Sequence, residues 1–488
     1  MELNTLFILL INSIVLVNGK NIVLIIADDL DLVLDGMTPL QNTRNIIGNN
    51  GATFLNCFVA SPLCCPNRAS ILTGRYQHNH QTFNNSLSGG CSSIKWQNTY
   101  EKHTFATILK TQKNYRTFYA GKYLNQYGTN LAGGPNHKPA GWDWWAGLIG
   151  NSKYYNYTLS VNGSAKFYGD KIKDYLTDVI AEMAVSFIRS SNNDAQPFLM
   201  VLAPPAPHAP FTPAVKHNDK FKKTKAKRTP NFNSSPQMDK HWLVRMSPSP
   251  LPHEILPKLD FIFRRRWETL LSVDDLVVTI YEALRLQKVL NNTYIIFTSD
   301  NGYHIGQFSM PFDKRQPYES DVRVPLLIRG PEIAVSQVRI PVSSVDLFDT
   351  ILHIAEIKEY SDGKSVLLKN VSHDRTVLIE YKGEKSLNHH NTTCADDFDL
   401  NLYGCDKNMA CKCEDSTNNT YSCIRRFSNN YNNIFCIFKD DQDYIEAYDL
   451  NKDQYQMINI GYKMNHRRRR RFRKRLNRMV KCIGSDCL

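Results

Sequence analysis

The sequence lacks several features that would assign it to a simple class. Beyond its N-terminus it has no uninterrupted run of about 18 apolar residues, so we expect no transmembrane helix. It has no internal repeat, and its cysteines form no repeated C-x2-C pairs of the kind that bind zinc. It is also short of acidic residues, with 46 Asp plus Glu against 59 Lys plus Arg.

The resulting formal charge of +13 and the pI of about 9.0 point to a polyanionic partner. Nucleic acid, an anionic membrane surface and a sulfated polysaccharide all fit that description. A composition of 42% hydrophobic and 11% aromatic residues excludes a disordered chain. At 488 residues, we expect two or three domains, or one large domain with a small one.

The N-terminus and the cysteines indicate export. An apolar run over Leu6–Val17, followed by Asn18 and Gly19, predicts a signal peptide over residues 1–19, although a buried strand or helix is the alternative. Eight of the 12 cysteines follow residue 390, which predicts disulfides in an exported chain. Asn-x-Ser/Thr sequons occur at Asn84, Asn156, Asn162, Asn233, Asn291, Asn370, Asn391 and Asn418.

Three apolar, β-branched-rich segments predict buried strands of a parallel sheet. They are Asn21–Ala27, Phe198–Ala203 and Tyr294–Thr298, and helical patterns over 171–190 and 267–287 lie between them. This alternation predicts an α/β fold with a mainly parallel sheet flanked by helices. Each strand ends in polar residues: Asp28-Asp29, a loop with His208, and Asp300-Asn301. One such end is an ordinary turn, but three together predict a ligand site.

The C-terminal part differs in composition. The parallel-sheet pattern fades after Ile354, and we predict a boundary near residue 370 between a catalytic domain (20–370) and a smaller Cys-rich α+β subdomain (371–488). Residues 467–478 hold nine Lys plus Arg and no acid, which leaves +4 for the remainder of the chain. This basic tail is an anchor for a sulfated polymer, a site for basic-residue proteases, or a solvated run.

Residues 64–74 read Cys-Cys-Pro-Asn-Arg-Ala-Ser-Ile-Leu-Thr-Gly. From the residues alone, Cys64 at a helix N-terminus beside Arg68 is expected to have a lowered pKa and to act as a nucleophile. The alternative is a disulfide or a packed cysteine, which in an exported protein is the more usual state of such a residue. The pattern C-x-P-x-R followed by A-x-x-L-T-G resembles the sulfatase signature, in which the first Cys is oxidised to formylglycine. The resemblance places that modification at Cys64, with Asn67 standing where the family usually has Ser.

Other segments resemble sulfatase motifs in the same order along the chain. They imply an alkaline-phosphatase-like sulfatase fold and one Ca²⁺ held by Asp28, Asp29, Cys64 as formylglycine, Asp300 and Asn301. They also imply that Lys122 and Lys314 bind sulfate, that Arg68 stabilises the hydrated aldehyde, and that His208 protonates the leaving oxygen. Leu124 stands where many sulfatases carry His. His241 and His304 are weaker candidates for substrate contact, equally well interpreted as structural.

Finer matches resemble the glucosamine-6-sulfatase group of the family, including Gly74-Arg-Tyr-Gln-His-Asn-His and Asn301-Gly-Tyr-His-Ile-Gly-Gln-Phe. They imply hydrolysis of the 6-O-sulfate of N-acetylglucosamine in heparan or keratan sulfate, after maturation by the formylglycine-generating enzyme. The alternatives are another sulfatase specificity, such as an arylsulfatase or an extracellular endosulfatase, and a non-catalytic glycosaminoglycan-binding homologue. Nucleic acid becomes the least expected partner. The expected location is the lysosome, with secretion as the alternative, and the oligomeric state stays open, a homodimer included.

Overall fold

The computed structural model of the chain describes residues 19–190, 196–236, 238–368, 374–384, 402, 406–428 and 430–488. The expected signal peptide, except for Gly19, the expected boundary at residue 370, and the cysteines Cys394 and Cys405 lie outside these ranges. Within them, no helix combines the length and the apolar character needed to cross a bilayer.

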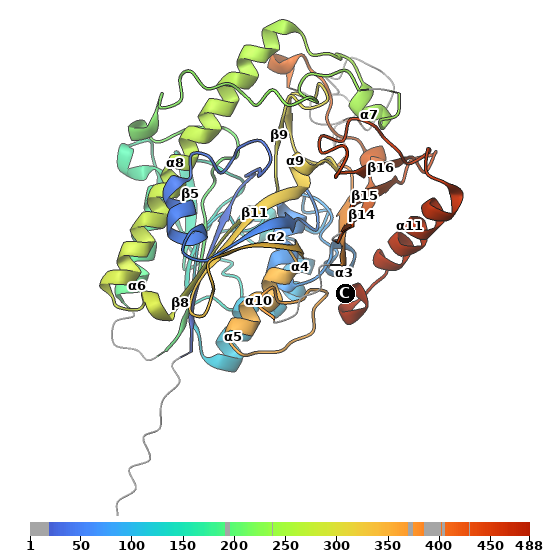
Figure 1. Ribbon diagram of the computed structural model, residues 1–488. Helices are drawn as coiled ribbons and strands as arrows, with labels where there is room; N and C mark the ends of the chain where they lie inside the picture. The colour runs from blue at the N-terminus through green and yellow to red at the C-terminus, as the bar shows by residue number, and fades with distance from the viewer. Residues whose placement is uncertain are drawn as a thin grey trace, which may run out of the picture.

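A large sheet forms the centre of the molecule (Figure 1). Its 10 strands are β1 (Asn21–Ala27), β2 (Ala52–Phe58), β3 (Arg116–Gly121), β4 (Trp144–Leu148), β5 (Tyr157–Val161), β6 (Ser164–Tyr168), β7 (Phe198–Ala203), β8 (Thr293–Ser299), β11 (Arg323–Arg329) and β12 (Ser336–Ser343). Their order is β12-β2-β11-β8-β1-β7-β3-β4-β5-β6. The five neighbours from β8 to β4 are all parallel, whereas β11, β5 and β6 pair antiparallel. The mainly parallel mixed sheet predicted from the sequence is confirmed.

Strand β1 shows why a continuous apolar run was the right signal. Ile22 and Leu24 point into one hydrophobic core, while Val23 and Ile25 point into the core on the opposite face. All seven residues of β1 are buried, because helices cover both faces of the sheet.

Helices pack on both faces of this sheet. Helices α2 (Cys64–Thr73), α5 (Phe105–Lys113) and α10 (Asp346–Ile354) cover one face, and α6 (Leu176–Arg189) and α8 (Leu256–Leu286) cover the other (Figure 1). Helix α8 begins 11 residues earlier than its sequence pattern predicted, with Pro257 in its first turn. The short helices are α1 (Gln41–Thr43), α3 (Gln77–His80), α4 (Ile94–Asn98), α7 (Trp242–Arg245) and α9 (Glu319–Val322).

A second, antiparallel sheet follows in the C-terminal part. It consists of β13 (Arg375–Tyr381), β14 (Tyr421–Ser428), β15 (Tyr431–Phe438) and β16 (Ile445–Asp449), in that order, and helix α11 (His466–Met479) packs beside it (Figure 1). A two-stranded ribbon of β9 (His304–Ile305) and β10 (Phe312–Asp313) lies in sequence between β8 and β11 of the large sheet. Disulfides join Cys423 to Cys436 and Cys482 to Cys487, and Cys411 and Cys413 are each disulfide-bonded. The predicted small Cys-rich subdomain is confirmed.

Candidate active site

The polar strand ends that the sequence singled out meet at one edge of the large sheet. Strands β8, β1, β7 and β3 are consecutive neighbours and run parallel. Their carboxyl ends therefore bring together Asp300-Asn301, Asp28-Asp29, the loop with His208, and Lys122. Lys314 reaches the same place from the loop that follows β10, so residues more than 200 positions apart form one cluster.

Oxygen atoms dominate this cluster. Ligand atoms of Asp28, Asp29, Cys64 and His208 lie within 4.8 Å of one another. Asn301 donates through Nδ2 to Asp29 at 2.7 Å, and its own Oδ1 is buried without a hydrogen-bond partner among the described residues. A buried amide oxygen with a free lone pair beside two carboxylates is a donor set that suits a hard cation such as Ca²⁺.

Two buried lysines neutralise the carboxylates. Lys122 Nζ lies 2.9 Å from both carboxylate oxygens of Asp28, and Lys314 Nζ lies 2.7 Å from both oxygens of Asp29. Burial opposes ionisation of Asp28, yet the charges of Lys122, His208 and Arg68 hold its pKa well below its usual range. The site therefore keeps full charges in a water-poor environment, where electrostatic interactions are strong.

Cys64 is the first residue of α2 and is fully buried, with its Sγ 3.8 Å from Oδ1 of Asp29. Its neighbour Cys65 forms a disulfide with Cys91, which leaves Cys64 a free thiol. Burial raises the pKa of Cys64 to about 12, although Lys122 opposes the shift. The lowered pKa expected from the sequence is therefore wrong, because desolvation of the thiolate outweighs the nearby positive charges.

Arg68 connects three of the strand ends. Its Nε donates to Asp300 at 2.7 Å, one terminal nitrogen donates to the carbonyl of Lys122 at 2.8 Å, and the other lies 3.4 Å from Asp28. The side chain is 2% exposed, so these contacts are made away from solvent. Because Cys64 and Arg68 lie one helical turn apart on α2, the same helix places the thiol against this charged network.

His208 faces the cluster from a turn between two prolines. Its Nδ1 lies 2.7 Å from the carbonyl of Ala209, which makes Nδ1 the protonated nitrogen, and its Nε2 lies 3.8 Å from Asp29. Burial lowers the pKa of His208, with Asp28 and Asp29 opposing the shift. The two weaker histidine candidates lie outside this cluster: His241 stacks on Phe438 at 4.2 Å, and His304 is buried against Asp321.

A cavity of about 450 Å³ opens onto the cluster. Its floor holds Asp29, His208 and Lys314, and its rim includes residues from both parts of the chain. The rim residues with polar side chains include Asn85, Asn125, Asn151, Asp313, Arg315, Glu384, Lys412 and Glu414. A polar, open cavity above a charged floor is suited to a hydrophilic substrate such as a sugar.

Comparison with known proteins identifies this arrangement. Residues 20–357 match the protein family described as Sulfatase. The chain belongs to the sulfatase family. It is 46% identical over 477 residues to N-acetylglucosamine-6-sulfatase from Capra hircus, which covers 96% of this chain and 84% of that protein. The human N-acetylglucosamine-6-sulfatase is also 46% identical, over 96% of this chain and 85% of its own length.

More distant relatives share the fold. The Extracellular sulfatase SULF-1 homolog of Drosophila melanogaster is 40% identical over 75% of this chain, which is 33% of its own length. A solved structure in complex with its substrate D-glucosamine-2-N,6-O-disulfate gives a TM-score of 0.72 at 22% identity, covering 95% of this chain and 98% of that chain. The two mammalian relatives at 46% identity, together with the family match, make the chain a sulfuric ester hydrolase.

The sulfatase departs from its family's pattern at Asn67 and Leu124, and the structure gives only the first a polar role. Asn67 Oδ1 accepts from the Ala60 amide at 3.0 Å and from the Ser344 hydroxyl at 2.5 Å, while its Nδ2 donates to the Asp300 carbonyl at 2.5 Å. Asn67 thus ties helix α2 to the end of β8. Leu124 is fully buried in the hydrophobic core and supplies no polar atom.

The sequence analysis missed Arg266, a buried residue of α8 that supports the sulfatase site from behind. Its guanidinium donates to the Asp29 carbonyl at 2.7 Å and to Asp31 at 3.1 Å. A signal was present in the sequence: Arg266 occupies the apolar stripe of α8 between Phe263 and Leu270. An arginine on the core-facing side of a helix needs a buried acceptor, and here the acceptors lie in the loop after β1, at Asp29 and Asp31.

Proposed function

We propose that this sulfatase hydrolyses the 6-O-sulfate ester of N-acetylglucosamine units in a glycosaminoglycan such as heparan or keratan sulfate. The 46% identity to mammalian N-acetylglucosamine-6-sulfatases over 96% of the chain is the observation that carries the proposal. The solved relative that binds a 6-sulfated glucosamine supports it at the level of the fold. The polar cavity is of a size and chemistry that suit one sulfated sugar.

The proposed nucleophile is formylglycine made from Cys64 by the formylglycine-generating enzyme. The burial of Cys64 supports this, because a neutral thiol with a pKa of about 12 is a poor nucleophile at physiological pH. In the proposed reaction one hydroxyl of the hydrated aldehyde attacks sulfur, and the S–O bond to the sugar breaks. The second hydroxyl then loses its proton and expels sulfate, which restores the aldehyde.

The charges of the site support a divalent cation. Asp28, Asp29 and Asp300 carry three negative charges at neutral pH, and the three cations Lys122, Lys314 and Arg68 balance them. The protein alone thus offers a sulfate ester no net attraction. When bound by Asp28, Asp29, Asp300, Asn301 and residue 64, Ca²⁺ supplies the missing positive charge.

Lys122, Lys314 and His208 act on the substrate directly, and Arg68 supports the nucleophile. Lys122 and Lys314 donate to the sulfate oxygens and so stabilise the charge that builds up on them in the transition state. Arg68 holds the nucleophile's surroundings in place through Asp300. His208, whose Nε2 faces the cluster, delivers a proton to the sugar oxygen as it leaves; it does so from the charged ring, protonated at both nitrogens, which Asp28 and Asp29 favour.

We place the protein in the secretory pathway, with the lysosome as its destination and secretion as the alternative. The eight sequons and the disulfides support export. The division into a catalytic domain over 20–370 and a Cys-rich subdomain over 371–488 stays a prediction, and the rim of the cavity holds residues from both ranges.

The test uses protein from a host that forms formylglycine. Sulfate release is measured on N-acetylglucosamine-6-sulfate, with galactose-6-sulfate and an aryl sulfate as comparison substrates. We expect preference for the first, loss of turnover in Cys64→Ala, and loss after chelation that Ca²⁺ restores. Mass spectrometry of the Cys64 peptide is the control for maturation. Fully converted enzyme that prefers another sulfate, or turnover that survives in Cys64→Ala, would refute the proposal.

A further inference from the structure

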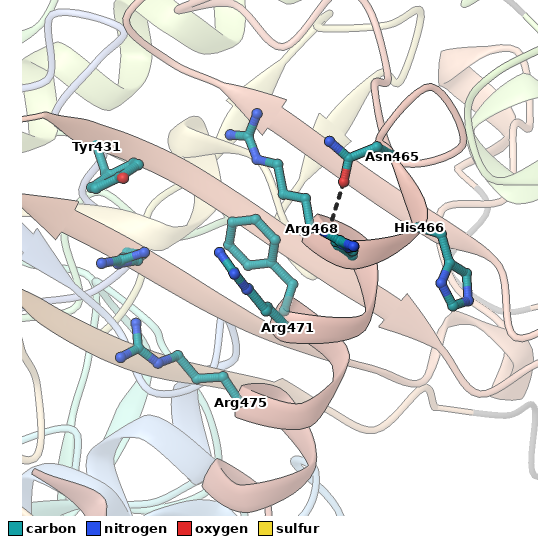
Figure 2. A pocket seen from close by; sticks show the side chains of 9 residues that line it. Tyr431, Asn465, His466, Arg468, Arg471 and Arg475 are labelled. Atoms are coloured by element: carbon teal, nitrogen blue, oxygen red, sulfur yellow. Dashed lines mark hydrogen bonds between the residues drawn. The ribbon is translucent and has the colours of Figure 1, made fainter.

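A second cavity lies away from the cluster around Asp28 and Asp29, along helix α11. It has a volume of about 820 Å³ and runs between the helix and the β14–β15 hairpin (Figure 2). Five arginines and one histidine line it, and none of its lining residues is acidic. We call it the α11 groove. Its basic lining residues are Arg426, His466, Arg467, Arg468, Arg471 and Arg475.

The arginines stand on successive turns of one helix flank. Arg467, Arg471 and Arg475 are four residues apart, so the row extends for about 12 Å at 1.5 Å per residue. Figure 2 shows Arg468, Arg471 and Arg475 projecting from α11 toward the side on which Tyr431 lies. Opposite them, the Arg426 guanidinium lies over the ring of Tyr431 at 4.3 Å, so the groove has cationic groups on both walls.

These charges have few partners within the protein. Of the groove arginines, Arg426 pairs with Asp374 at 3.4 Å, and the ion pairs of the described residues include none for the four on α11. Like charges four residues apart repel one another on a helix. Burial and the charges of Arg426 and Arg478 lower the pKa of Arg475, which reflects the same crowding.

The helix is nevertheless held firmly, so the row of charges has a fixed shape. Phe472, Leu476 and Met479 are buried, and Phe472 stacks on Phe435 of β15 at 5.2 Å. The Asn465 side chain caps the first turn, and the Cys482–Cys487 disulfide follows the last. A preorganised row of arginines that repel one another has its charge balanced when an anionic ligand binds.

We propose that the α11 groove binds a segment of sulfated polysaccharide, outside the catalytic cavity. This rests on the proposed function, since a glycosaminoglycan substrate carries sulfates and carboxylates along its length. Guanidinium groups bind both anions through paired N–H donors. A row of about 12 Å, open along its length, matches a linear polyanion better than a single small anion.

Two other polyanions fit the groove less well. Insertion into a membrane surface needs an exposed apolar face, but the apolar side chains of α11 point into the protein. Binding of single-stranded nucleic acid uses aromatic rings for base stacking, and the Arg426 guanidinium already covers one face of Tyr431, the aromatic residue exposed at the groove.

Strand β14 relates the groove to the catalytic cavity. At its start, the Tyr421 hydroxyl donates to the carbonyl of Arg315, a rim residue of the cavity. At its other end lies Arg426, five residues on and roughly 17 Å away at about 3.4 Å per residue. A bound chain must therefore be several sugars long to occupy both sites, and a monosaccharide cannot use the groove while it is hydrolysed.

The experiment compares two triple variants that remove the same charge from opposite flanks of α11. The groove variant combines Arg468→Ala, Arg471→Ala and Arg475→Ala. The control combines Arg469→Ala, Arg470→Ala and Arg473→Ala, residues that line the other flank. The full-length matured protein is used, and equal Tm values verify folding. Binding to heparin is measured between 50 and 300 mM salt, together with kcat and KM on a monosaccharide sulfate and on heparan sulfate.

We expect the groove variant to bind heparin about tenfold or more weakly, with a salt slope smaller by about two to three, because each lost contact releases about one counterion fewer. The control is expected to change less than threefold. On heparan sulfate the groove variant raises KM and keeps kcat, and on the monosaccharide it matches the wild type. If the proposed catalytic function is wrong, the wild type hydrolyses neither the monosaccharide sulfate nor heparan sulfate. The difference in heparin binding between the groove variant and the control is still expected in that case.

Three results would overturn the proposal. The first is an equal loss of binding in both variants, which would indicate only net charge. The second is unchanged binding in the groove variant. The third is wild-type binding to single-stranded RNA or to phosphatidylserine vesicles that equals or exceeds binding to heparin at about 150 mM salt, which would assign the groove to another polyanion.

Discussion

Replacement of Asn67 by alanine tests whether this residue holds helix α2 to the end of strand β8, beside the proposed metal ligands. The side chain makes three buried hydrogen bonds, to Ala60, Ser344 and Asp300. In Asn67→Ala the Ala60 amide keeps a second acceptor, the Ser344 hydroxyl oxygen at 2.9 Å. The Ser344 hydroxyl hydrogen and the Asp300 carbonyl lose their partner.

The cost follows from those two groups. Leaving one buried polar group without a hydrogen bond costs about 1 to 3 kcal/mol, so for the two groups the free energy of unfolding is expected to fall by about 2 to 6 kcal/mol. Asn67→Ser keeps one hydroxyl at the position and is expected to fall between the wild type and Asn67→Ala. The loss of the bond to Asp300 also loosens a proposed metal ligand, so kcat is expected to fall in the matured fraction of the variant.

Urea unfolding measures the stability, and the matched control is Asn45→Ala. The Asn45 side chain accepts one hydrogen bond, from Nδ2 of Asn49 at 2.9 Å on the exposed surface, so its loss is expected to change stability by about 0.5 kcal/mol or less. Because Asn67 lies inside the modification motif, mass spectrometry must give the formylglycine content before rates are compared. If Asn67→Ala destabilises no more than Asn45→Ala, the tether described above does not exist.

Two further perturbations probe the support of the site. Arg266→Met leaves Asp31 buried without its cation and is expected to cost about 3 to 5 kcal/mol in thermal unfolding. The comparison is Arg264→Met, which is half-buried and loses one hydrogen bond to the Thr224 carbonyl, and it is expected to cost about 1 kcal/mol. His80 is buried against Ser70, beside His78 and Arg75, and burial lowers its pKa to about 3. Since the unfolded state binds that proton below pH 6.5, stability is expected to fall by about 2 kcal/mol from pH 7 to 5, and His80→Gln should remove this part of the slope.

The sequence revealed the frame of the site because its signals are local. An apolar run ending in Asp28-Asp29 is both a buried strand and a ligand pair, and β1 ends where the run ends. Once a parallel sheet was inferred, the polar strand ends at Asp28-Asp29, His208 and Asp300-Asn301 predicted a shared site, whereas Cys64 and Lys122 were assigned to it by the resemblance to sulfatase motifs.

The features that the sequence did not predict depend on burial and on contacts between distant segments. The raised pKa of Cys64 follows from its complete desolvation, which no neighbour in sequence reveals. The threefold role of Asn67 needs Ser344 and the end of β8, which are more than 200 residues away. Arg266 follows Arg264 and Arg265 in the sequence, and only its helical phase, between Phe263 and Leu270, places it among core residues.

The charge of the chain is therefore divided between two environments with different physics. The catalytic cluster balances its own charges in buried pairs, such as Lys122 with Asp28, which salt screens weakly. The α11 arginines are on the surface, where the Debye length of about 8 Å at 0.15 M salt limits their reach. Rising ionic strength must then weaken the hold on a polymer well before it affects hydrolysis of a single sugar. Turnover of heparan sulfate that falls with salt while monosaccharide turnover stays constant is the kinetic signature of this division.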